Sequence, residues 1–493
     1  MRFGVRNKTG KHAVYNLVGL GFPLLAAVLT IPLLIKLLGL DRFGVLTLMW
    51  AVVSYFGLFD LGLGRSLTQH LSVALRNEDA SESKRIIGTS NAILMALGFI
   101  AMFMLLLSSD FVSRHIADAE LIDEAKVAVR WMAFAMIPII MTSGLRGILE
   151  AHHKFGQLNA IRVPMGLYTF IAPLVTVWLI GPRLDAIGFW LAFGRYLFFF
   201  VHVAVARKMI SGFGSLKTYH LETARSLFTQ GGWMTLSNIV SPAMGYADRF
   251  VIAALLGSTA VAYYVSPYEL ATKLWILPGA ITAAVFPSFS MLYKNDNERF
   301  NQLFRRAVDG VFTIVWPIAL CLALFSHEIL SIWIDLEFSE NSFRFLQIFA
   351  FGIFINCLAQ VPLSLLHSAK ESRIPAMIHV IEFPIYIAAV FTLTAKFGLL
   401  GTAVAWLARI IADTLLMFIL SRQLLSNSQR RISRNACYQL MASFLSFSGV
   451  FFDSTAWRIS ILLAVLVSTF VKALEFMKSR ASEQTIASAS KKV

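Results

Sequence analysis

Long apolar runs separated by short charged segments make up most of this chain. The first run, residues 13–35, contains no charged residue and is long enough to cross a bilayer. Similar runs recur almost to the end of the sequence, and each is predicted to be a helix because an open sheet cannot satisfy its backbone in lipid. The predicted spans are 14–37, 44–71, 86–108, 127–149, 158–180, 186–206, 227–254, 261–288, 307–327, 344–368, 374–395, 399–421, 435–452 and 457–476.

Composition supports an all-α polytopic membrane protein with about fourteen transmembrane helices. The 493 residues have a mean hydropathy of +0.69, and only 14% are charged, which is less than a soluble chain carries. The three cysteines lie in or beside apolar runs, so the sequence indicates neither a disulfide framework nor a metal site.

The net charge of +15 has an uneven distribution along the chain. Lys and Arg gather at both termini and in every second loop, whereas the opposite loops carry acidic clusters at 118–124 and 335–340. Because Lys and Arg mark cytoplasmic loops, both termini are predicted to be cytoplasmic. The basic balance therefore reflects topology, and nucleic acid is not an expected partner.

Two halves of six spans each show an internal repeat. Residues 37–44 align with 255–262, and the Arg-x-Pro at 162–164 aligns with that at 373–375. Since each half starts and ends on the same side, the repeats are predicted to be related by a pseudo-twofold axis along the membrane normal, with a cavity between two lobes. The predicted parts are an N-terminal six-helix lobe 1–206, a cytoplasmic connection 207–226, a C-terminal six-helix lobe 227–421, an extra helix pair 422–477 and a disordered tail 478–493.

Several charged residues fall inside the predicted spans. A charge there costs at least a few kcal/mol unless it faces a partner or water, so a wet internal cavity is expected. The basic residues considered to bind a substrate are Arg249, Lys273, Arg195, Arg409, Arg65 and Arg146. The acidic residues considered for coupling to H⁺ or Na⁺ are Asp60, Asp248 and Glu269.

A structural interpretation of the same charges stays open. Glu269 with Lys273, and Arg409 with Asp413, have the i,i+4 spacing of local ion pairs. Asp60 could instead cap a helix break near Gly62, since Asp often bonds to its local backbone. No phosphate-binding loop of the GxxxxGK[ST] type occurs, so the sequence does not indicate ATP hydrolysis.

The N-terminal pattern resembles the polysaccharide-transport family. It contains Pro32, LLG at 37–39, FG at 43–44 and YFGLFDLGLGRSLT at 55–68. This resemblance, which runs over about residues 1–421, is to the Wzx-type O-antigen flippases of the superfamily that also holds MATE exporters and lipid II flippases. It implies a V-shaped, two-lobed, MATE-like fold in the bacterial inner membrane. Family members usually have twelve spans, so the extra helix pair is a departure.

The resemblance also implies a function and partners. The family moves undecaprenyl-pyrophosphate-linked oligosaccharide from the cytoplasmic to the periplasmic leaflet through a cationic lumen, by alternating access and without enzymatic chemistry. A pyrophosphate suits Arg, whose planar fork matches phosphate oxygens. Other expected partners are membrane lipids and polysaccharide polymerase or chain-length proteins, and no cofactor is expected apart from the coupling ion.

Three alternatives remain at the level of sequence. A MATE-like ion-coupled antiporter of small molecules would need an acidic cavity for cationic drugs. A membrane-bound polymerase or ligase would need a sizeable periplasmic loop, and the outer loops here are short. A non-enzymatic assembly scaffold would have no need of buried charge.

Overall fold

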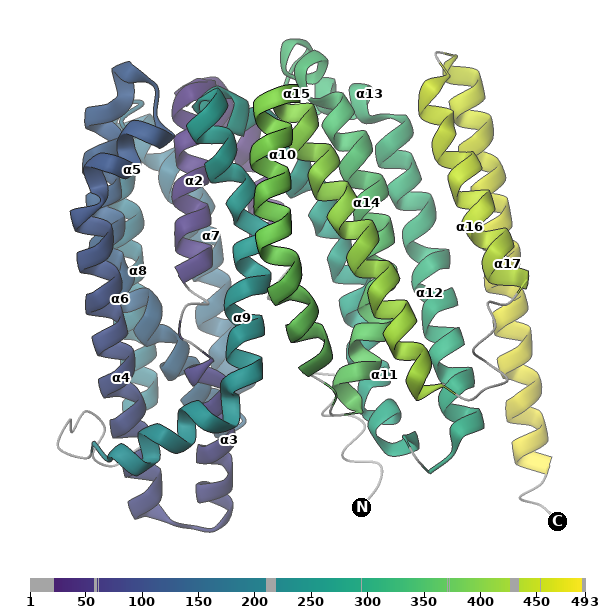
Figure 1. The fold of residues 1–493 in the computed structure, drawn as a ribbon, viewed down its shortest axis with the longest axis horizontal. Coiled ribbons are helices and arrows are strands. Elements are labelled where there is room, and N and C mark those ends of the chain that lie inside the picture. Colours follow the sequence, from purple (N-terminus) through teal and green to yellow (C-terminus); the bar gives the residue numbers. More distant parts are fainter. Residues whose placement is uncertain are drawn as a thin grey trace. The chain divides into compact units, whose positions relative to one another are not determined.

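The structure is a computed structural model that describes residues 22–56, 60, 62–209, 219–293, 295–369, 371, 373–425, 434–452 and 454–489. Over these residues it is all-helical, as predicted (Figure 1). Nine of the described helices or joined helix pairs are long and apolar enough to cross a membrane. The count of fourteen spans therefore stays a prediction.

The helices follow one another with short connections. Their bounds are Phe22–Leu38, α2 Leu40–Phe56, α3 Leu63–Arg76, α4 Ala80–Leu107, α5 Ser109–Ile116, α6 Ile122–Ala151, α7 Phe155–Ile180, α8 Leu184–Arg207, α9 Leu221–Leu256, α10 Ser258–Thr272, α11 Ile276–Leu292, α12 Asn297–Leu324, α13 Ser326–Trp333, α14 Leu336–Ser368, α15 Arg373–Ser421, α16 Arg434–Phe447 and α17 Thr455–Ala489. The 3₁₀ turn Lys273–Trp275 joins α10 to α11.

The chain divides into two compact units, each of which is discontinuous in sequence. Unit 1 comprises Met1–Ser266 and Ala376–Thr402, and unit 2 comprises Pro267–Pro375 and Ala403–Val493. These bounds differ from the predicted lobes, because α9 begins within the predicted connection 207–226, runs into the predicted C-terminal lobe and yet packs on α2, α3 and α4 in unit 1. The arrangement as two six-helix lobes stays a prediction, and each unit is described by itself.

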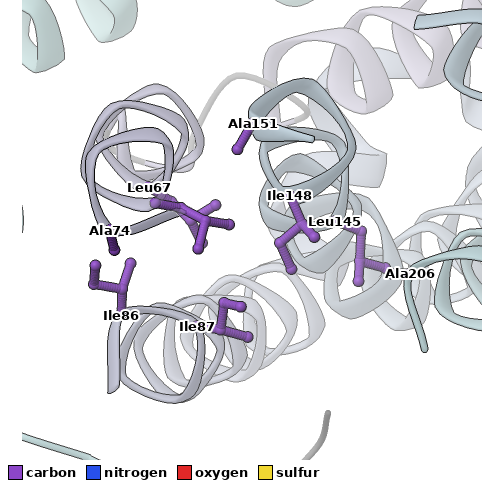
Figure 2. Packing of buried hydrophobic residues seen from close by; sticks show 9 residues of the cluster. Leu67, Ala74, Ile86, Ile87, Leu145, Ile148, Ala151 and Ala206 are labelled. Atoms are coloured by element: carbon purple, nitrogen blue, oxygen red, sulfur yellow. The ribbon is translucent and has the colours of Figure 1, made fainter. Parts of the chain in front are cut away.

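A cluster of small and branched apolar side chains holds unit 1 together around α3. The buried members from α3, α4, α6 and α8 face one another in Figure 2. They are Leu67, Leu71, Ala74, Ile86, Ile87, Leu145, Ile148, Ala151 and Ala206. Since lipid is as apolar as these side chains, close van der Waals packing rather than burial from water holds the helices together. This cluster fixes the segments of α6 and α8 that carry the basic residues described below.

Polar contacts attach the start of α9 to α3. The hydroxyl of Ser66 donates to the carbonyl of Leu227 at 2.8 Å. One turn further along α3, Nε2 of His70 lies 3.2 Å from the hydroxyl of Ser226. The first turns of α9 are thereby part of unit 1.

The predicted single span 44–71 is wrong, because it consists of two helices. The first helix, α2, ends at Phe56, and α3 begins at Leu63. Gly62 before α3 has a φ of 72°, a left-handed conformation that favours glycine and that ends regular helix geometry. The mostly apolar stretch 55–63 hides this break from hydropathy, whereas the Asp-Leu-Gly pattern at 60–62 indicated it. Residues 57–59 and 61 lie outside the described part of the chain.

The C-terminal part of the chain differs from prediction in one respect. The two predicted spans 374–395 and 399–421 are present as α15, which is interrupted at Gly398 by a φ of 60°. The tail predicted as disordered from residue 478 is instead helical as far as Ala489. Its Ala, Lys and Glu residues favour helix, and an apolar helix immediately before them removes the cost of nucleation.

The extra helix pair packs within unit 2. Both α16 and α17 contact α12. The indole N–H of Trp316 on α12 donates to the hydroxyl of Ser446 on α16 at 3.0 Å. The ring of Phe351 on α14 meets that of Phe447 edge to face, with centroids 5.0 Å apart. These contacts make α16 and α17 integral parts of unit 2.

Candidate functional site

Three arginines from three helices form a basic cluster in unit 1. Arg146 lies on α6 and Arg195 on α8, both are half-buried, and their charges interact. Arg162, which is exposed on α7, also interacts electrostatically with Arg146. Nη2 of Arg195 donates to the hydroxyl of Thr169 at 3.2 Å. Within the described residues, neither Arg146 nor Arg195 has a hydrogen bond to a carboxylate.

Two carboxylates attract Arg146, those of Asp60 and Glu150, and the first of them is already used by the backbone. Asp60 attracts Arg146, but its Oδ1 accepts the amide hydrogen of Gly62 and its Oδ2 that of Gly64, each at 3.0 Å. This geometry confirms the prediction that Asp60 caps the helix break near Gly62. The three arginines therefore outnumber the two carboxylates that attract Arg146, and an excess of positive charge of this kind can bind an anion.

A buried acid and a buried base stand next to each other on α9. Asp248 is 1% exposed and Arg249 is 3% exposed. Oδ1 of Asp248 accepts the backbone N–H of Arg249 at 2.8 Å, and Oδ2 accepts the phenol of Tyr264 at 2.9 Å and, at the longer distance of 3.5 Å, that of Tyr386. The guanidinium of Arg249 lies 5.0 Å from the ring centroid of Tyr246. A backbone amide and two phenols thus donate to Asp248; such hydrogen bonds favour the charged carboxylate, whereas its burial favours the neutral form.

The predicted residues in unit 2 form a second group. Nζ of Lys273 lies 2.9 Å from Oε2 of Glu269, which confirms the i,i+4 ion pair expected from their spacing. On α15, Arg409 is half-buried and Asp413 is buried, and their pairing stays a prediction. Arg65, on α3 in unit 1, is exposed. The structure thus brings Arg146 and Arg195 together, whereas a cavity shared by both units stays a prediction.

The two turns that the internal repeat relates contact each other within unit 1. The hydroxyl of Thr259 donates to Asp41, and that of Ser258 donates to Asp118 at 2.8 Å. Gly44 lies directly against the backbone of Ser258, so closely that a Cβ at this glycine would fall 1.9 Å from the carbonyl oxygen of Ser258. The repeat therefore supplies both sides of a single interface.

An ion pair braces the same end of unit 1. The guanidinium of Arg42 donates two hydrogen bonds to the carboxylate of Glu124, from Nη2 to Oε1 at 2.9 Å and from Nε to Oε2 at 3.2 Å. This hydrogen-bonded carboxylate raises the pKa of Arg42 above its usual value. Oε2 of Glu124 also accepts the backbone N–H of Leu184 at the start of α8, at 3.3 Å. The pair thereby connects α2, α6 and α8.

Sequence reasoning missed three residues of these sites. Arg162 was visible in the repeated Arg-x-Pro motif at 162–164, but its place at a span end hid its proximity to Arg146. Tyr264 and Tyr386 gave no signal, because tyrosines in apolar helices are common and the second lies 138 residues from Asp248 in sequence.

Comparisons with known proteins give consistent results. Residues 33–342 match the family model described as "Polysaccharide biosynthesis protein". A protein of Shigella flexneri described as a candidate O-antigen transporter is 34% identical over 409 residues, which cover 83% of this chain and 96% of that protein.

Solved structures with a similar fold are transporters of low sequence identity. An inward-facing multidrug resistance MATE family transporter of the MOP superfamily superimposes with a TM-score of 0.71 at 12% identity, covering 83% of this chain and 97% of its own. The lipid II flippase MurJ, in an inward closed conformation, gives 0.68 at 15% identity, covering 95% and 99%. These likenesses confirm the predicted MATE-like fold.

Proposed function

Because the chain belongs to the polysaccharide biosynthesis protein family, we propose that it is a flippase for lipid-linked oligosaccharide, a transporter rather than an enzyme. Its substrate is an undecaprenyl-pyrophosphate-linked repeat unit, which it moves from the cytoplasmic to the periplasmic leaflet of a bacterial inner membrane by alternating access. The observation that carries this proposal is the proximity of Arg146 to Arg195, two half-buried arginines on the packed helices α6 and α8 that interact electrostatically and have no hydrogen bond to a carboxylate among the described residues.

The chemistry of this cluster suits the pyrophosphate linkage. A guanidinium presents a planar fork of donors to phosphate oxygens, and two forks from different helices can hold two phosphates. Repulsion between Arg146 and Arg195 disfavours the empty site, and a bound dianion relieves it. Arg162 adds a third positive charge at the exposed edge of the cluster. The remaining basic residues, which we propose as further contacts of the same group along its path, are Arg249, Lys273, Arg409 and Arg65.

A deletion of the gene tests this function directly. We expect lipid-linked repeat units to accumulate in the cytoplasmic leaflet and surface polysaccharide to disappear, with both effects reversed by a plasmid copy. The measurement combines extraction of the lipid-linked intermediates with a membrane-impermeant reagent that labels only sugars exposed on the periplasmic side. If the accumulated units are labelled as in the wild type, translocation occurs without this protein and the proposal fails.

We further propose that Asp248 binds the coupling H⁺ or Na⁺. Its burial makes the charged form costly, and a bound proton or small cation would remove that cost. The two other acidic candidates are only half-buried, and Glu269 pairs with Lys273. An ion-coupled antiporter of small molecules would use the same carboxylate, and the deletion experiment separates the two functions.

Asp248→Asn is expected to remove the dependence of transport on the external pH or Na⁺ concentration, because the amide keeps the shape of the protonated acid and cannot titrate. Asp60→Asn is the matched control, and it should keep the wild-type dependence since that side chain serves the backbone of Gly62 and Gly64. The measurement is the rate of translocation in vesicles over a range of pH and Na⁺ concentration. Wild-type dependence in Asp248→Asn would exclude this residue as the coupling site.

A further inference from the structure

Unit 2 contains a groove between α11 and α14, and none of the residues discussed so far lines it. Its volume is about 260 Å³, smaller than the roughly 300–1,000 Å³ of pockets that enclose whole drug-sized ligands, so it suits one part of a larger molecule. The described residues that line it are Gly279, Thr282, Ala283 and Phe286 from α11, and Gln360, Leu363, Ser364 and His367 from α14.

Two polar side chains in this groove have hydrogen-bonding capacity to spare. Gln360 and Ser364 are half-buried and lie one helical turn apart on α14. Neither side chain forms a hydrogen bond with another described residue. Gln360 lies about 12 Å before the end of α14 at a rise of 1.5 Å per residue, within the apolar part of the helix. An amide there costs about 1–3 kcal/mol without a partner, so water or a ligand must supply one.

The opposite wall of the groove is apolar and open. The ring of Phe286 is 40% exposed. Gly279, one turn before Thr282, has no atom within 4 Å of the position that a Cβ would take, so the floor of the groove is empty space there. An amide and a hydroxyl facing an exposed ring form a surface with one polar and one apolar side.

The residues that line the groove decide between the three parts of a lipid-linked oligosaccharide. None of the described lining residues is an Arg or Lys, so the groove lacks the cationic donors that suit a pyrophosphate. The uncompensated amide and hydroxyl make it unfavourable for a polyprenyl chain. A sugar ring fits both walls, because its hydroxyls can bond with Gln360 and Ser364 while its C–H face lies on Phe286.

We propose that this groove is a subsite for one neutral sugar of the transported repeat unit. The inference rests on the proposed function for the existence of such a substrate, but it concerns a different part of the substrate from the arginine cluster. It makes the groove responsible for recognition of the saccharide, while the arginines of unit 1 recognise the phosphates.

The test uses the purified full-length protein and two labelled probes. One probe is bare undecaprenyl pyrophosphate, and the other is the lipid-linked repeat unit extracted from the deletion strain. Gly279→Leu fills the groove, and the double variant Gln360→Leu/Ser364→Ala removes its hydrogen bonds. Gly310→Leu is the matched control, because Gly310 on α12 also has no atom within 4 Å of its Cβ position. Thermal unfolding of every variant confirms that the protein is folded.

We expect both groove variants to bind the repeat-unit lipid about tenfold more weakly than the wild type, because the double variant loses two hydrogen bonds and Gly279→Leu fills the space of the sugar, and to bind the bare lipid as the wild type does. Gly310→Leu should bind both probes normally, and Arg146→Ala should weaken both. Groove variants that lose affinity for both lipids equally, or for neither, would overturn the sugar subsite. Unchanged binding of both lipids by Arg146→Ala would instead contradict the proposed phosphate site, whatever the groove variants show.

Discussion

Arg146→Ala is expected to lower the rate of repeat-unit translocation by about 10–100-fold, and Arg146→Ala/Arg195→Ala is expected to abolish surface polysaccharide. A hydrogen bond to a charged group contributes about 1.5–3 kcal/mol, and each 1.4 kcal/mol corresponds to a factor of ten. Because the two guanidinium groups interact with each other, the effects of the single changes should not add. Arg146→Lys should fall between Ala and the wild type, since it keeps the charge and loses the planar fork.

The matched control for this series lies on the same helix. Arg130 is exposed on α6, more than four turns before Arg146, and Arg130→Ala should export normally. The measurement is the fraction of lipid-linked repeat units that becomes accessible to an impermeant label, at equal amounts of inserted protein. Normal export by the double arginine variant would mean that the cluster does not bind the substrate.

Gly44→Ala is expected to destabilise the protein by about 1–3 kcal/mol, the usual cost of forcing atoms into a packed site, and to stop transport. The added Cβ would meet the carbonyl oxygen of Ser258 at 1.9 Å, and this atom belongs to the backbone and cannot rotate away. Separation of the two turns would also break the hydrogen bonds from Ser258 to Asp118 and from Thr259 to Asp41.

The control for Gly44 is Gly156→Ala on α7, where nothing lies within 4 Å of the added atom. This change should leave stability the same or raise it slightly, because Ala favours helix over Gly. Both variants can be compared by thermal unfolding in detergent and by surface polysaccharide. Equal unfolding temperatures for Gly44→Ala and the wild type would show that the repeat-related turns separate without cost.

Interactions that are local in sequence were predictable. The i,i+4 spacing indicated the pair Glu269–Lys273, and the Asp-Leu-Gly segment indicated a cap by Asp60, because helix geometry and Asx turns fix such contacts over a few residues. The repeat identified residues 37–44 and 255–262 as equivalent. It carried no information that these two turns would contact each other.

Interactions between distant segments were not predictable from one sequence. The pairing of Arg146 with Arg195 depends on how α6 packs on α8, and the contact of Asp248 with Tyr386 depends on where α15 returns. Hydropathy placed Arg249, Arg195 and Arg146 inside predicted spans. It could not show which of these side chains would lie beside another arginine.

The discontinuous make-up of unit 1 has a consequence for biogenesis. Ala376–Thr402 is synthesised only after Pro267–Pro375, which belongs to the other unit. Domains generally fold as units as the chain emerges N-terminal end first, so the helices of Met1–Ser266 must wait in the membrane for their last partner. During that interval the carboxylate of Asp248 lacks the phenol of Tyr386. Insertion factors that shield incomplete helical bundles should therefore be most needed late in translation, when α15 enters the membrane.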